Sequence, residues 1–125
     1  MLGWHSSVYR QRDGGQSPAQ FGSPKGPRIA VWQSGAGGLE WLDQEVRAGR
    51  AISLGGNGYP VRYTATAGTL LPQILDGPPA AREHWLLEAG DIVTAGWEGK
   101  TTLDRDAIAQ CGPSEWLLVE AWDES

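Results

Sequence analysis

Seven tryptophans in 125 residues place the strongest constraint on this chain, because one falls in nearly every segment that carries a structural pattern. Each indole ring can bury on the order of 150–250 Å² and has one N–H group that needs an acceptor. So many large rings in a small chain must either build its core or form a surface that holds another molecule. The seven are Trp4, Trp32, Trp41, Trp85, Trp97, Trp116 and Trp122.

The length of the chain fits one domain with a single hydrophobic core, since a chain of this size buries roughly two-thirds of its unfolded surface. The one cysteine, Cys111, excludes an internal disulfide and is typical of a reducing compartment. No apolar run approaches the ~20 residues of a membrane span, and the first seven residues lack the features of a secretory signal. We therefore expect a cytoplasmic protein with no membrane partner.

The charge is unevenly divided along the chain. Residues 1–28 carry four basic side chains and one acid, a net charge of +3, whereas residues 29–125 carry six basic and fourteen acidic side chains, a net charge of −8. An acidic body repels phosphate backbones, which disfavours nucleic acid as a partner. The dilute positive charge of the first segment is typical of a solvated leader.

The N-terminal part of the chain predicts little regular structure. Residues 11–28 are dominated by Gly, Ser, Pro and Gln, and Phe21 is their one bulky side chain, so they form no packed face of their own. We expect an irregular arm over residues 1–27 and a compact domain over residues 28–125. Through Trp4, Tyr9 and Phe21, the arm could dock onto this body or onto a second copy of the chain.

Strand and helix patterns alternate through the rest of the chain. Six segments have strand patterns, at residues 29–32, 51–54, 61–67, 84–88, 92–97 and 116–122. Three have helical patterns, at residues 39–46, 69–75 and 101–111. The order β-α-β-β-(α)-β-β-α-β favours an α+β fold with a mixed or antiparallel sheet.

Two of these segments carry more specific predictions. Residues 116–122 are apolar on both faces apart from Glu120, which predicts a strand in the interior of the sheet. Thr101 and Asp104 are spaced as a capping box, which predicts a helix that begins at Thr101 and runs to Cys111.

No segment has a pattern for catalysis or for metal or cofactor binding. The glycine-rich stretch from Gly55 to Pro60 is followed by a strand and lacks the lysine of a phosphate loop, so it predicts a hairpin turn. Two histidines and one cysteine offer neither a nucleophile with its base nor a zinc-binding spacing. Near a helix C-terminus, Cys111 is expected to have a raised pKa. We predict no catalytic residue, no metal and no cofactor, and we lean against an enzyme.

The aromatic residues give the best candidates for a binding site. Trp97 lies in a turn, where an indole is hard to bury, while Tyr59 lies at the hairpin and Arg62 on the polar face of a strand. Trp41 neighbours the apolar stripe of the first helix. Exposed aromatic residues with arginine are the usual composition of protein-interface hot spots.

The preferred reading is a small protein-binding module, an accessory, inhibitor or immunity-type factor whose partner is another protein or a second copy of itself. A second hypothesis is a small-molecule-binding domain or small enzyme with a tryptophan-lined pocket. A third is a homo-oligomeric structural protein.

Overall fold

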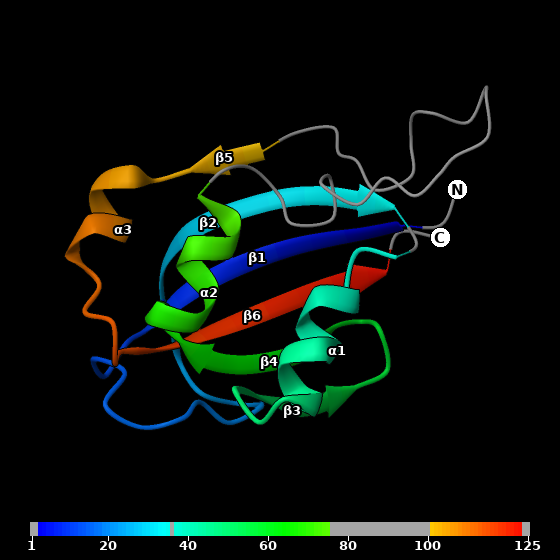
Figure 1. The fold of residues 1–125 in the computed structure, drawn as a ribbon, viewed down its shortest axis with the longest axis horizontal. Coiled ribbons are helices and arrows are strands. Elements are labelled where there is room, and N and C mark those ends of the chain that lie inside the picture. Colours follow the sequence, from blue (N-terminus) through cyan, green and yellow to red (C-terminus); the bar gives the residue numbers. More distant parts are fainter. Residues whose placement is uncertain (1–2, 36, 76–100, 124–125) are drawn as a thin grey trace.

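The computed structural model describes residues 3–35, 37–75 and 101–123. These residues form one six-stranded antiparallel sheet and three helices (Figure 1), which confirms the predicted α+β fold. The strands are β1 (Gly3–Gln11), β2 (Lys25–Gly35), β3 (Ala51–Gly56), β4 (Val61–Thr66), β5 (Thr101–Leu103) and β6 (Trp116–Asp123). The helices are α1 (Glu40–Arg47), α2 (Ala67–Ile74) and α3 (Arg105–Gln110). The strands predicted at residues 84–88 and 92–97 lie outside the described residues.

The strand order across the sheet is β3-β4-β6-β1-β2-β5. The last strand, β6, therefore lies in the interior of the sheet, as its apolar sequence predicts. Val119 of β6 is paired with Val8 of β1 on one side and with Tyr63 of β4 on the other. Leu117, Val119 and Ala121 have no exposed surface, so the inner face of β6 is buried from Leu117 to Ala121.

Strand β1 corrects the prediction of an irregular arm over residues 1–27. It lies between β6 and β2 and pairs with both along most of its length. The strand has few apolar residues, and serines, Ser6 and Ser7, stand at two of its buried positions. The two ladders satisfy its backbone groups, so the strand does not depend on apolar side chains of its own. The irregular chain is confined to residues 12–24, which connect β1 to β2.

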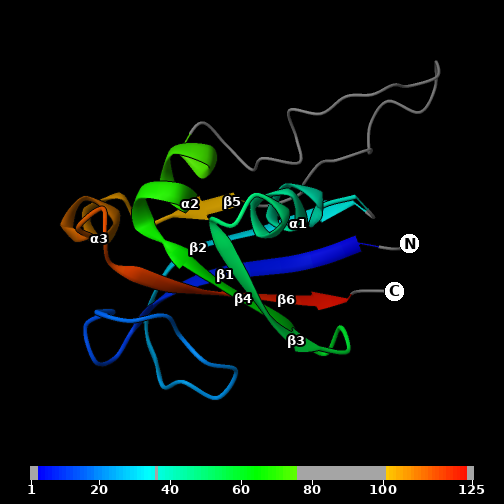
Figure 2. The ribbon, with the colours of Figure 1, turned by 60° about the horizontal axis from the view of Figure 1, so that its bottom comes forward.

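Helices α1 and α2 cover one face of the sheet (Figure 2). The apolar side chains of both helices pack on the inward rows of the strands to form the core. A hydrogen bond of 2.9 Å, donated by the Tyr63 hydroxyl to Asp43 Oδ1, joins β4 to α1. Burial, together with the Asp43 carboxylate, raises the pKa of Tyr63. The largest fully buried core side chains include Trp32, Ile29, Leu42, Leu70, Ile74, Leu117, Val8 and Val119.

Two local features set the boundaries of neighbouring elements: the turn between β3 and β4, and the N-cap of α3. The chain from β3 to β4 is a hairpin, as predicted, and a Cβ atom at Gly56 would collide with the carbonyl oxygen of Pro60. Helix α3 begins at Arg105 and not at Thr101, because Asp104 is itself the N-cap and accepts a hydrogen bond from the Ala107 N–H at 3.1 Å. The residues before this cap form the short strand β5.

Candidate binding face

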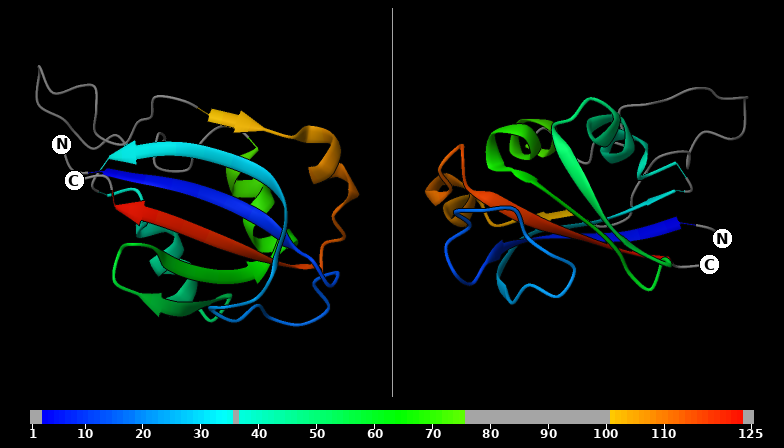
Figure 3. Two further views of the ribbon diagram at one scale, coloured as in Figure 1. Left: turned by 180° about the vertical axis from the view of Figure 1, so that it is seen from behind. Right: turned by 90° about the horizontal axis from the view of Figure 1, so that it is seen from below.

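The face of the sheet that points away from α1 and α2 has no described helix across it (Figure 3). We call this surface the outer face. Strand register arranges its side chains in rows that cross the sheet. One row runs from Arg62 of β4 through Glu120, Ser7 and Val31 to Thr102 of β5. A second row consists of Trp122, His5 and Gln33.

The first row contains a buried carboxylate that two cations neutralise and that a third donor, an indole N–H, also contacts. Glu120 is only 2% exposed. Its Oε2 accepts from Arg62 Nε at 3.0 Å and from Lys25 Nζ at 3.1 Å, and its Oε1 accepts from Trp122 Nε1 at 3.2 Å. Burial alone raises the pKa of Glu120, but the hydrogen bonds from Trp122, Arg62 and Lys25 outweigh burial and leave this pKa below its usual value. The cluster fixes the orientation of the Trp122 ring.

Residues 12–24 cover one end of the outer face (Figure 3). The Ala19 N–H donates to Thr64 Oγ1 at 3.1 Å, and the Arg62 guanidinium lies 4.5 Å from the centre of the Phe21 ring. Leu118, which points to the outer face, has no exposed surface. Arg62 therefore contacts both Glu120 of β6 and the connecting segment, residues 12–24.

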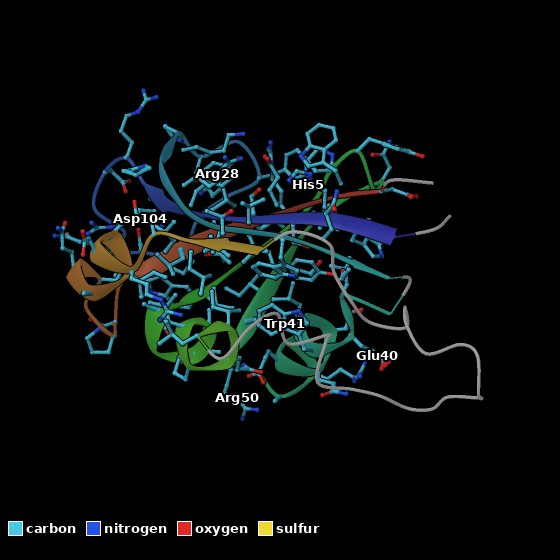
Figure 4. All side chains as sticks on the ribbon, turned by 90° about the horizontal axis from the view of Figure 1, so that it is seen from above. His5, Arg28, Glu40, Trp41, Arg50 and Asp104 are labelled. Carbon is cyan, nitrogen blue, oxygen red and sulfur yellow. The ribbon has the colours of Figure 1, made fainter. Side chains whose placement is uncertain are left out.

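The other end of the outer face is open and contains a shallow hollow of about 180 Å³. Figure 4 shows His5 and Arg28 on this side of the sheet, with Trp41 on the opposite side among the helices. His5, Arg28, Val31, Gln33 and Thr102 line the hollow together with part of Trp32. Trp122 is the register partner of His5, and 41% of its surface is exposed. The open area thus joins an exposed indole, a guanidinium and an imidazole.

Of the four residues that the sequence predicts as a site, the structure describes three and places them in different surroundings. Trp41 is 6% exposed and packs in the core with its ring centre 6.2 Å from that of Trp32, so its prediction as a surface anchor is corrected. Tyr59 is exposed at the β3–β4 hairpin. Arg62 is on the outer face, but its guanidinium is engaged by Glu120 and Phe21. Trp97 lies outside the described residues.

Sequence reasoning missed three residues of the open area. The sequence places His5 in an irregular arm, Arg28 at the start of the compact domain, and Trp122 in strand packing, and it gives none of the three a binding role. Glu120 offered a usable signal, because an acid within an apolar strand needs cationic partners on its own face. An alternating strand that buries Glu120 against the outer face also places Trp122, two residues later, on that face.

Elsewhere on the described surface, fewer polar side chains gather in one place. A groove of about 310 Å³ between α2 and α3 is lined by apolar side chains such as Leu71, Leu75 and Ile108. Its one thiol, Cys111 Sγ, lies 3.5 Å from the Ala107 carbonyl oxygen. Burial raises the pKa of Cys111, in the direction predicted for an unreactive thiol. The described part of the chain has no group of three or more His, Cys, Asp and Glu side chains that could hold a metal ion.

Comparison of the sequence with protein families and with curated proteins, and of the fold with solved structures, gives no match. Among the described helices, none has the length and apolar character needed to cross a membrane.

Proposed function

We propose that this chain is a protein-binding module and that its binding surface is the open area of the outer face. The observation that carries the proposal is the combination of an exposed, oriented Trp122 ring with the exposed Arg28 side chain on a rigid sheet. Tryptophan and arginine are the residue types most enriched among interface hot spots. The hydrogen bond to Glu120 orients the Trp122 ring before binding, which lowers the conformational entropy that association costs.

The shape of the surface favours a macromolecule over a small ligand. Pockets for small molecules usually enclose about 300–1,000 Å³, and the hollow of the outer face holds about 180 Å³. A shallow hollow of this size suits one protruding side chain of a partner. A pocket-based enzyme, the alternative drawn from the sequence, gains no comparable support from the outer face.

The charges of the open area indicate an acidic partner surface. Arg28 forms no ion pair with any other described residue, and the one carboxylate buried in this face, Glu120, is already neutralised by Arg62 and Lys25. A carboxylate of the partner could therefore pair with Arg28 without displacing an internal bond. Such pairing raises the association rate and makes binding sensitive to salt. The single cysteine supports a reducing, cytoplasmic setting for this interaction.

The test compares the open area with exposed residues elsewhere on the chain. The face variant combines Trp122→Ala with Arg28→Gln, and the matched control combines Ile52→Ala on β3 with Arg50→Gln after α1. Ile52 is 43% exposed, similar to Trp122, and Figure 4 shows Arg50 on the helix side, far from Arg28. Each protein is immobilised and exposed to extract of the native host, and the retained proteins are quantified by mass spectrometry at low and high salt.

The expected result is a partner that the wild-type chain and the control retain at low salt, and that the face variant loses by at least tenfold. Sedimentation of the purified chain reveals whether that partner is a second copy. The proposal is wrong if every partner is retained equally by the face variant, or if the control loses it as well.

A further inference from the structure

The hollow of the outer face combines an apolar floor with a polar rim. Its floor is Val31 of β2, which is half-buried and has Ser7 of β1 and Thr102 of β5 as its register partners. Gln33 lies two residues further along β2, on the same face as Val31, and pairs with His5. The exposed Thr102 therefore borders the hollow from the edge strand, while His5 and Gln33 border one end of it.

Arg28 lines the hollow from the other end. It lies three residues before Val31, so regular alternation would turn it to the inner face of the sheet. The register shift between Val8 and Tyr9 reverses this expectation and makes Arg28 the partner of Tyr9. Figure 4 shows Arg28 on the same side of the sheet as His5. The irregularity in the ladder thus brings a cation to the rim of an apolar hollow.

The lining residues define the chemistry of a matching ligand. A guanidinium group offers its N–H donors in a planar fork that fits a carboxylate, and a threonine hydroxyl can donate a further hydrogen bond. The side chain of Val31 favours methylene groups, because removing them from water is favourable. Arg28, Thr102 and Val31 together match a carboxylate that stands on a short apolar stem.

The size of the hollow sets the length of that stem. An apolar cavity of about 150 Å³ is large enough for a benzene molecule, and this hollow holds about 180 Å³. A glutamate side chain has one heavy atom fewer than benzene and carries two methylene groups, whereas aspartate carries one. Glutamate is therefore the acidic side chain that fits both the floor and the rim.

We propose that the hollow is the subsite for a glutamate side chain of the protein partner. The carboxylate binds Arg28 and Thr102, and the methylene groups lie over Val31. This inference rests on the proposed function and names the group of the partner that the open area recognises. An ion pair exposed to water contributes little, but a partner that covers the hollow shields this pair from water and salt.

The test uses the purified full chain, labelled with ¹⁵N, and three tripeptides capped at both ends. Each peptide has two glycines, with glutamate, glutamine or aspartate between them. We expect the glutamate peptide to shift the backbone amide signals of Val31, Gln33 and Thr102 at low salt. The glutamine peptide should bind at least about tenfold more weakly because it lacks the charge, and the aspartate peptide about fourfold more weakly because it lacks one methylene group.

Three variants assign the binding to the hollow. Arg28→Gln should weaken binding of the glutamate peptide by at least about tenfold. Thr102→Val keeps the β-branched shape that suits a strand and should weaken binding by about fivefold through loss of the hydroxyl. Arg47→Gln is the matched control, because it removes the same charge from an exposed position on α1, on the other side of the sheet (Figure 2). This control should bind as the wild type does.

The proposal is wrong if the glutamine or the aspartate peptide binds as tightly as the glutamate peptide, or if Arg47→Gln weakens binding as much as Arg28→Gln. It is also wrong if a capped glycine peptide with a free C-terminal carboxylate binds more tightly, since the subsite then belongs to a chain terminus. The partner-capture experiment separates this result from the proposed function. A face variant that loses its partner, in a chain without preference for glutamate, rejects the glutamate subsite and keeps the protein-binding surface. Selective binding of the glutamate peptide, with every partner still retained by the face variant, supports the subsite and rejects the proposed function.

Discussion

At the scale of single residues, Glu120 shows how one carboxylate ties together segments from three parts of the chain. Its side chain accepts hydrogen bonds from Lys25 of β2, from Arg62 of β4 and from Trp122 of its own strand. Removal of the charge leaves Arg62, which is largely buried, without its main partner. Loss of one partner from such a pair is more costly than the net contribution of the intact pair.

Glu120→Gln should therefore destabilise the fold by about 2 kcal/mol near neutral pH. Because the pKa of Glu120 in the folded chain is below its usual value of 4.5, this contribution is fully present above the unfolded pKa. It is lost as the pH falls through the lower, folded pKa. Thermal unfolding between pH 7 and pH 3 should show the wild type and the variant converging at the acidic end.

Glu45→Gln provides the comparison, since Glu45 pairs with the exposed Arg50. Water screens this pair, so its removal should leave the Tm nearly unchanged at every pH. A Glu120→Gln variant that melts with the wild type at pH 7 would show that the buried cluster adds nothing to stability.

At the scale of helices and strands, the sequence predicts elements well where the residues of a segment carry their own pattern. The apolar run of β6, the alternation of β4 and the periodic stripe of α1 all appear at the predicted places. β1 could not be found in this way, because two of its buried positions, one on each face of the sheet, are the serines Ser6 and Ser7. The candidate site was missed for the same reason, since His5 belongs to β1 and the open area exists only once the strands are in register.

The interior place of β6 predicts a sharp contrast between two equivalent substitutions. Val119→Asp puts an unpaired carboxylate between Val8 and Tyr63 and should abolish cooperative folding. Ile52→Asp, on the edge strand β3 and 43% exposed, should leave the circular dichroism spectrum and the Tm close to those of the wild type. A native-like spectrum and Tm for Val119→Asp would contradict the central position of β6.

At the scale of the whole molecule, the described chain has two layers and one additional covering segment. Helices protect one face of the sheet, and residues 12–24 protect part of the other (Figure 3). The covering segment contributes few buried side chains, chiefly Ala19, whereas β1 contributes Val8 and two ladders to the sheet. We therefore expect the fold to require the strand within the first 27 residues and to tolerate the loss of the connection that follows it.

Two deletions should separate these contributions. Arg12 and Pro24 already form a backbone hydrogen bond, so residues 13–23 can be replaced by an Asn-Gly turn between them. This variant should unfold cooperatively at a Tm several degrees lower, because Leu118 and Thr64 lose their cover. Removal of residues 1–11 should leave no cooperative transition. A folded protein after the second deletion, or an unchanged Tm after the first, would contradict this division.

The position of β6 also has a consequence for the order in which the molecule can assemble. Without residues 116–123, the described sheet has no ladder between the β3–β4 hairpin and the β1–β2 pair, because β6 alone pairs with both. A nascent chain that has not yet reached β6 therefore holds two separate hairpins with exposed inner faces. The core closes only after synthesis of the last strand, so during translation these faces are open to chaperones and to misassociation.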